Sequence, residues 1–284
     1  MTRQRGGRFG KGVAAAVAAI YVLPLAMAVA LWYADGTRPA DWRTARRDSA
    51  GIAPPAAATR EAVIQVYAAP AVRWRGAFGV HTWIAAKAQG APEYTRFDVM
   101  GFGVARGRSA VRVRTGVPDG YWYGAEPELI REVRGGEEVD RLIERLHAAA
   151  RDYPYDRVYR LWPGPNSNTF IAALGRSVPE LSIDLPPTAV GKDYLPGGRM
   201  VGRPASGSGF QFSLFGVFGL ILSPQEGIEL NLIGLCAGMD FHPPALKLPG
   251  LGRIGFADKI EGKRTVHGAV RPMPSAGGVD LSPP

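Results

Sequence analysis

Two side chains that could perform acyl-transfer chemistry stand far apart in the sequence, at His81 and Ser167. His81 lies within the apolar segment 78–84, where a polar ring is costly to bury unless it is hydrogen-bonded. Ser167 follows a Pro-Gly-Pro loop at 163–165 and precedes the apolar run 170–174, which is predicted to be a buried helix. A histidine can act as the general base for a hydroxyl, so this pair predicts nucleophilic attack on an amide or ester.

The remaining parts of such a site can also be assigned from the sequence. An imidazole base needs a third group to fix its tautomer, and Asp98 is our first choice, with Glu93 second. The free N–H groups at the start of the helix would form the oxyanion hole. We expect substrate contacts from the polar residues beside Ser167 and from two aromatic residues, namely Asn166, Asn168, Thr169, Trp83 and Tyr123.

Each of these residues also has a purely structural interpretation. A serine just before a helix is usually a cap, and a histidine within an apolar strand is usually a core residue with a hydrogen-bond partner. Tyr123 and Glu126 could equally serve the fold alone.

The order of these motifs resembles a known superfamily. A histidine on an early strand, followed by an Asn-Cys pair that opens a helix, is typical of the circularly permuted branch of the papain-like NlpC-type superfamily. That branch includes lecithin:retinol acyltransferase-like proteins and bacterial envelope hydrolases. His81 matches the family's base, and residues 166–170 match its nucleophile motif, with Ser167 at the cysteine position. The resemblance implies an α+β fold in which a permuted papain-like antiparallel sheet packs on helices.

A second resemblance covers residues 61 to about 258, which are similar to a bacterial family of membrane-anchored proteins with a domain of unknown function. It rests on the motifs at residues 81–83, 123–127 and 162–170. The superfamily resemblance implies a hydrolase or acyltransferase acting on an amide or ester, and we expect a cell-wall peptide or a lipid as its substrate. A serine hydroxyl is much less ionised than a thiol at neutral pH, so two hypotheses stay open. The alternative is a non-catalytic envelope protein that binds a peptide, glycan or lipid in the same cleft.

The N-terminal region predicts a membrane anchor. Residues 12–34 form an uncharged apolar stretch that is long enough to cross a bilayer as one helix. The basic residues in segment 1–11 favour a cytoplasmic position for that segment, and Trp32 and Tyr33 suit the far interface. Small residues at 26–30 also fit a signal peptidase site, so a cleaved signal peptide is the alternative. Both interpretations place the body outside the cytoplasm. With the anchor retained, we expect the protein at a bacterial inner membrane with the bulk of the chain periplasmic.

The segments after this anchor alternate between linkers and folded regions. Residues 35–60 have the composition of a linker, residues 61–258 are expected to fold as an extracytoplasmic domain, and the Gly- and Pro-rich segment 259–284 is predicted to be a disordered tail. Within the domain we expect strands at residues 61–68, 78–86, 95–103 and 109–115.

The second half of the domain is predicted to begin with helices. The apolar spacing indicates a helix at 136–152, followed by a short helix at 168–175. The irregular segment 178–208 is expected to wrap around the surface. Two apolar runs, 209–222 and 227–241, predict a buried C-terminal β-hairpin extension.

The composition argues against several classes of protein. The net charge is +9, but the basic residues are not gathered into a stripe with aromatic residues between them, so no nucleic-acid partner is expected. The four histidines lack the spacing of a zinc site, and the glycines at 250–255 follow no strand, so neither a metal nor a nucleotide cofactor is expected. Cys236 is the single cysteine and lies in an apolar run, where a buried free thiol is expected.

Overall fold

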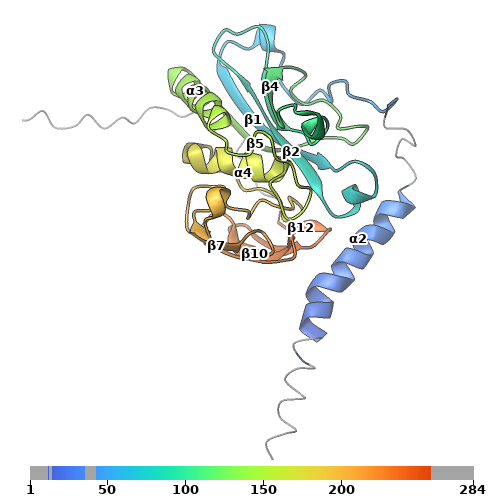
Figure 1. The fold of residues 1–284 in the computed structure, drawn as a ribbon. Helices are drawn as coiled ribbons and strands as arrows, with labels where there is room; N and C mark the ends of the chain where they lie inside the picture. Colours follow the sequence, from blue (N-terminus) through green and yellow to red (C-terminus); the bar gives the residue numbers. More distant parts are fainter. Residues whose placement is uncertain (1–11, 13–14, 36–42, 257–284) are drawn as a thin grey trace, which may run out of the picture.

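The computed structural model describes residue 12 and residues 15–35 and 43–256. The predicted disordered tail and the whole basic segment 1–11 therefore lie outside the described residues. The described fold is α+β, with two antiparallel sheets and three α-helices (Figure 1).

The first sheet has five strands in the order β4-β3-β2-β1-β5. The strands are β1 (Ala62–Pro70), β2 (Val80–Lys87), β3 (Thr95–Val99), β4 (Val111–Thr115) and β5 (Glu128–Gly135). Four of them occupy the regions predicted to be strands. The sequence analysis missed β5 because four of its eight residues are charged, which hides the β pattern.

Two helices pack on one face of this sheet. Helix α3 (Glu137–Arg151) buries Val139, Ile143, Leu146 and Ala150, which confirms the helix predicted at 136–152. Helix α4 (Ser167–Ser177) begins one residue earlier than predicted. The even-numbered apolar side chains of β1 and β2 meet both helices in the main hydrophobic core, because alternate side chains of a strand share one face.

The other face of the first sheet carries a smaller, more aromatic core. Tyr67 and Trp83 stack there with ring centroids 5.5 Å apart. The second half of the predicted linker packs against this face instead of leading directly into the first strand: Ile52 and Ala53 donate their N–H groups to the buried carboxylate of Asp119. The region of the chain that folds with the domain therefore begins before residue 61.

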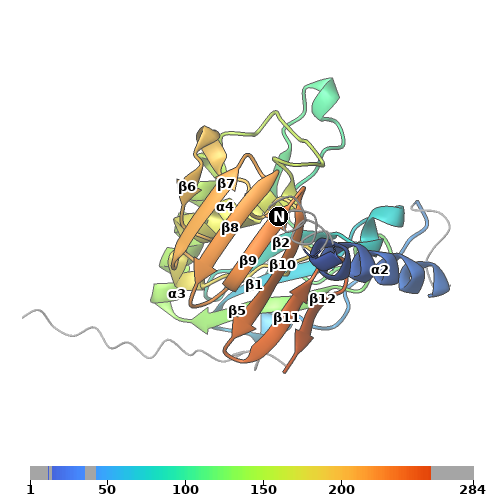
Figure 2. The ribbon, with the colours of Figure 1, turned by 90° about the horizontal axis from the view of Figure 1, so that it is seen from below.

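The second sheet has seven strands in the order β12-β11-β10-β9-β8-β7-β6 (Figure 2). The strands are β6 (Val201–Gly202), β7 (Phe210–Leu214), β8 (Phe218–Ser223), β9 (Gly227–Leu232), β10 (Leu235–Phe241), β11 (Pro244–Leu248) and β12 (Gly252–Gly255). The predicted C-terminal β-hairpin extension is therefore wrong in its size. Each of the two apolar runs folds into a hairpin of its own, with tight turns at Gly216 and Gly234 in the left-handed region.

The prediction that the segment 178–208 wraps around the surface is also wrong. Ile183, Leu185 and Ala189 are buried in the main core, and the next part of the segment reaches the second sheet through Lys192 and Asp193. This segment thus fills the space between α4 and the second sheet.

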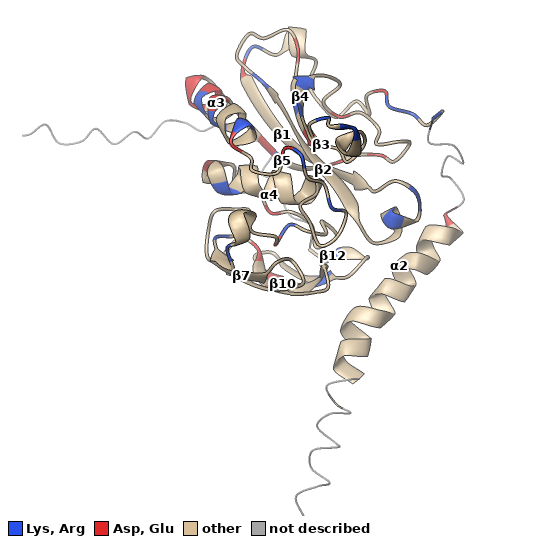
Figure 3. Cartoon of the chain, viewed as in Figure 1, with Lys and Arg blue, Asp and Glu red and all other residues tan. Residues whose placement is uncertain are grey.

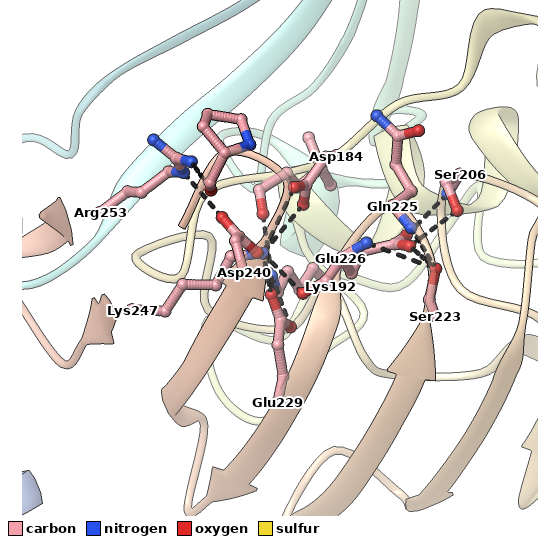
Figure 4. Close-up of polar contacts among 12 residues, drawn as sticks. Asp184, Lys192, Ser206, Ser223, Gln225, Glu226, Glu229, Asp240, Lys247 and Arg253 are labelled. Carbon is pink, nitrogen blue, oxygen red and sulfur yellow. Dashed lines mark hydrogen bonds and ion pairs between the residues drawn. The ribbon is translucent and has the colours of Figure 1, made fainter. Parts of the chain in front are cut away.

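The orientation of the second sheet is the reverse of what its apolar pattern suggested. Phe210, Leu222 and Ile228 were expected to be buried, yet each is more than 40% exposed. The alternate positions, which include Glu229, Asp240 and Lys247, are buried beneath the sheet. Figure 4 shows these polar side chains gathered under the sheet. The sheet can bury its polar face because oppositely charged groups meet there.

The N-terminal helix extends from Ala15 to Ala34, with a π-helical turn at Ala18–Val22 followed by α2 (Leu23–Ala34). Its mean hydropathy reaches 2.2 over a membrane-length window, so it is long and apolar enough to cross a membrane or to serve as a signal sequence. Such a helix indicates secretion or membrane anchoring.

Candidate functional site

The imidazole of His81 is fixed by Asp98. The His81 Nε2 atom lies 2.8 Å from Asp98 Oδ1, and both side chains are buried. The second carboxylate oxygen of Asp98 accepts a hydrogen bond of 3.2 Å from Nε of Arg96. The contact that the sequence analysis proposed between His81 and Asp98 is thus present, and β2 and β3 position it.

Aromatic rings pack against His81 and against Arg96, which binds Asp98. The His81 ring is parallel to the ring of Trp122, with centroids 3.6 Å apart. The guanidinium of Arg96 lies over the ring of Trp83, 4.1 Å from its centroid, and Trp83 donates its indole N–H to the carbonyl of Pro118. The cluster of His81, Trp83, Arg96, Asp98 and Trp122 therefore has little freedom to change conformation.

The charges within this cluster are strongly coupled. Burial alone would raise the pKa of Asp98, but His81 and Arg96 hold it below its ordinary value. Burial also lowers the pKa of Arg96, which stays protonated at neutral pH because an arginine starts far above that range. The carboxylate of Asp98 is therefore ionised at neutral pH and faces two nitrogen donors.

The first turn of α4 is held by a capping box at Asn166. The side-chain oxygen of Asn166 accepts hydrogen bonds from the N–H groups of Asn168 and Thr169, while the Thr169 hydroxyl accepts from the N–H of Asn166. Asn166 and Asn168 both donate to the carbonyl of Val190. These polar groups are thus occupied within the fold, and their expected contacts with a substrate stay predictions.

Asn168 also ties α4 to the strand that carries His81. Its side chain accepts a hydrogen bond from the Thr82 hydroxyl and donates one to the carbonyl of Val80. Successive side chains of a strand point to opposite faces, so Thr82 faces α4 while the His81 ring faces Trp122. No hydrogen bond between Ser167 and His81 occurs among the described residues.

A pocket of about 280 Å³ opens beside the pair. Asp98 and Trp122 form part of its wall, together with the predicted contact residue Tyr123. Three arginines, Arg47, Arg96 and Arg114, also line it. The sequence analysis missed these arginines, although Arg96 stands two residues before Asp98 and thus shares its face of the strand.

A protein-family model matches the part of the chain that contains this site. Residues 61–194 match the family model described as a protein of unknown function, DUF3750. This stretch is a DUF3750 domain. The match includes His81, Asp98 and Ser167 and ends before β6, so the second sheet lies outside it.

The other two comparisons found no similar protein. No curated protein and no solved structure matches the chain. The DUF3750 domain is therefore shown by its family model alone, and none of the comparisons links the chain to the papain-like superfamily.

Proposed function

We propose that this protein is a membrane-tethered protein of the cell envelope whose DUF3750 domain binds an anionic ligand in the pocket beside His81 and Asp98. The observation that carries the proposal is the set of three arginines around this pocket, against the single carboxylate of Asp98. Asp98 is already paired with His81 and Arg96, so its carboxylate does not neutralise Arg114.

Arg114 is the residue best placed to meet a ligand. It lies on β4, its side chain is exposed, and it forms no hydrogen bond or ion pair with any described residue. A free guanidinium can bind a carboxylate or a phosphate through two parallel hydrogen bonds. Tyr121, Trp122 and Tyr123 add an aromatic wall for an apolar part of the ligand. A peptide carboxyl group or a lipid phosphate would satisfy this chemistry.

Two small probes test the proposal and separate these sources. Acetyl-alanyl-alanine presents a terminal carboxylate, and glycerol 1-phosphate presents a phosphate monoester. We expect calorimetric binding of at least one probe to the full chain in detergent, with a loss of about tenfold in Arg114→Gln, because one charge-assisted contact contributes about 1.5 kcal/mol or more. The control is Arg157→Gln, which removes another exposed arginine that does not line the pocket. Equal binding by both variants, or no binding at all, would overturn the proposal.

A second candidate function is a hydrolase or acyltransferase of permuted papain-like type. The His81–Asp98 pair supports it, because a carboxylate at one ring nitrogen is the arrangement that prepares an imidazole to act as a base. Ser167 at the start of α4 is the proposed nucleophile, and the N–H groups of that turn are the proposed oxyanion hole. The described structure places the His81 ring on the face of β2 opposite α4, so this mechanism requires a rearrangement that brings His81 and the Ser167 hydroxyl together.

A fluorophosphonate probe tests this second function. Labelling of the wild-type chain that disappears in Ser167→Ala and His81→Ala, but persists in Ser177→Ala, would support catalysis. Ser177 is a suitable control because it lies at the other end of the same helix. A chain that stays unlabelled, or that is labelled equally in all variants, would leave ligand binding as the function of this domain.

A further inference from the structure

The outer face of the second sheet is apolar at every position. Strand pairing and alternation place nineteen side chains or glycines on this face, and none is polar or charged. They are Val201, Phe210, Phe212, Leu214, Phe218, Leu220, Leu222, Ile228, Leu230, Leu232, Leu235, Ala237, Met239, Phe241, Pro244, Leu246, Leu248, Gly252 and Ile254. Antiparallel sheets that face water normally alternate apolar residues inside with polar residues outside, and here the alternation is inverted.

The inner face explains why the inversion is stable. Lys192 and Lys247 both donate hydrogen bonds to Glu229, at 2.8 Å and 2.7 Å, and Lys247 lies 2.8 Å from Asp240. Figure 4 shows these charged groups converging beneath the strands. The sheet thus buries its charged side chains and exposes its apolar ones. This arrangement is expected of a surface that faces hydrocarbon.

The turns at one end of the sheet show the same preference. The β7–β8 turn places Phe215 at φ 50°, and the β9–β10 turn places Ile233 at φ 55°. Such left-handed positions normally carry Gly, Asn or Asp. Here they carry large apolar side chains that are 48% and 65% exposed. Since β8 and β9 pair with Phe218 opposite Leu232, both turns lie at the same end of the sheet.

The N-terminal helix contacts the second sheet beside this face. The Tyr21 hydroxyl donates to the carbonyl of Leu230 at 2.9 Å, and a β-carbon added at Gly250 would lie only 2.7 Å from Cβ of Ala28. Figure 2 views the outer face, with the helix against one side of it. In Figure 1 the N-terminal half of the helix extends below the level of the sheet, and Figure 3 shows no charge along it.

We infer that the outer face of β6–β12 lies in the lipid bilayer surface, next to the apolar N-terminal helix. The occupant of the face is lipid because the one described element already packed against it is a helix of membrane-spanning length and composition. The protein would then be held by a helix and by a broad sheet that rests on the same membrane. The DUF3750 domain would have a fixed orientation above the bilayer.

A lipid-quenching experiment tests this inference with the full chain. The chain is reconstituted into phosphatidylcholine and phosphatidylglycerol vesicles, and the fluorophore NBD is attached at Leu222→Cys or Leu246→Cys. Both positions are exposed on the face, 43% and 51%, so the replacements leave the core intact. Cys236 is buried, and labelling of the wild-type chain measures any background from it. The control is Arg141→Cys on the solvent side of α3.

The inference predicts that NBD at residues 222 and 246 shows blue-shifted emission that is quenched by lipids with a doxyl group on the acyl chain. NBD at residue 141 should emit as in water and be quenched by iodide. Water-like emission at 222 and 246 would overturn the inference. Blue-shifted emission without doxyl quenching would also overturn it, because a protein partner or a second copy would then cover the face.

Discussion

The ammonium group of Lys247 lies 2.7 Å from a carboxylate oxygen of Glu229, and both side chains are almost completely buried beneath the second sheet. Lys192 binds the same carboxylate from the segment that follows α4. Burial alone would raise the pKa of Glu229, but the two lysines more than offset this and lower it. One carboxylate therefore joins the second sheet to the rest of the fold.

Replacement of Glu229 by Gln should strongly destabilise the chain. The variant would keep two buried ammonium groups but remove the negative charge between them, and such a loss commonly costs about 3–5 kcal/mol. The free energy of unfolding from denaturant titration in detergent measures the effect. Glu137→Gln is the matched control, because Glu137 is exposed and its nearest arginine nitrogen is 3.9 Å away. Equal stability of the two variants would contradict this account of the ion network.

The ionisation of Asp193 should make the free energy of unfolding decrease as the pH rises. Its burial raises its pKa to about 6, above the ordinary value of 3.8. Between about pH 4 and pH 6 the folded chain keeps a proton that the unfolded chain releases, so this group's contribution declines through that window and is level above it. Asp193→Asn should therefore gain stability relative to wild type between pH 4 and pH 8, by on the order of 2 kcal/mol. The difference in unfolding free energy at the two pH values measures this, and a pH-independent difference would refute it.

The ionisation of Asp98 should have the opposite effect on the free energy of unfolding, which should rise with pH. Its folded pKa lies below 3.8, so its stabilising contribution is complete above about pH 4 and is lost as the pH falls through the folded pKa. Asp98→Asn should be less stable than wild type by about 2 kcal/mol at pH 6, because Arg96 and His81 lose a charged partner. The gap should narrow below pH 4. Asp152→Asn removes an exposed carboxylate and should show no such pattern.

Loss of the cap at Asn166 should loosen the start of α4. Asn166 satisfies two N–H groups of the first turn and donates to the carbonyls of Leu161 and Val190. Asn166→Ala should cost about 2 kcal/mol, and amide hydrogen exchange should increase in the first turn of α4. Ser177→Ala, at the exposed end of the same helix, should leave that exchange unchanged. Unchanged protection in Asn166→Ala would show that packing alone holds the turn.

The local elements of this protein follow largely from its sequence. The apolar spacing of Val139, Ile143 and Leu146 determines one buried face for α3, and the prolines before Asn166 determine where α4 can begin. The N-terminal helix follows from an uncharged stretch of sufficient length. These features depend on contacts between residues that are close in the chain.

The sites depend on contacts between distant residues, so only the tertiary structure decided them. The sequence indicated that His81 needed a partner, and the pairing of β2 with β3 brought Asp98 to it, while the position of Trp122 depended on a loop with no regular pattern.

The second sheet gives the clearest physical reason for this division. Alternation at Ile228, Glu229 and Leu230 establishes that the strand has an apolar face and a polar face, but a period of two is the same whichever face is inside. The tertiary structure decides that the polar face is buried, because Lys192 and Lys247 form ion pairs with Glu229 there. The apolar face therefore points outward.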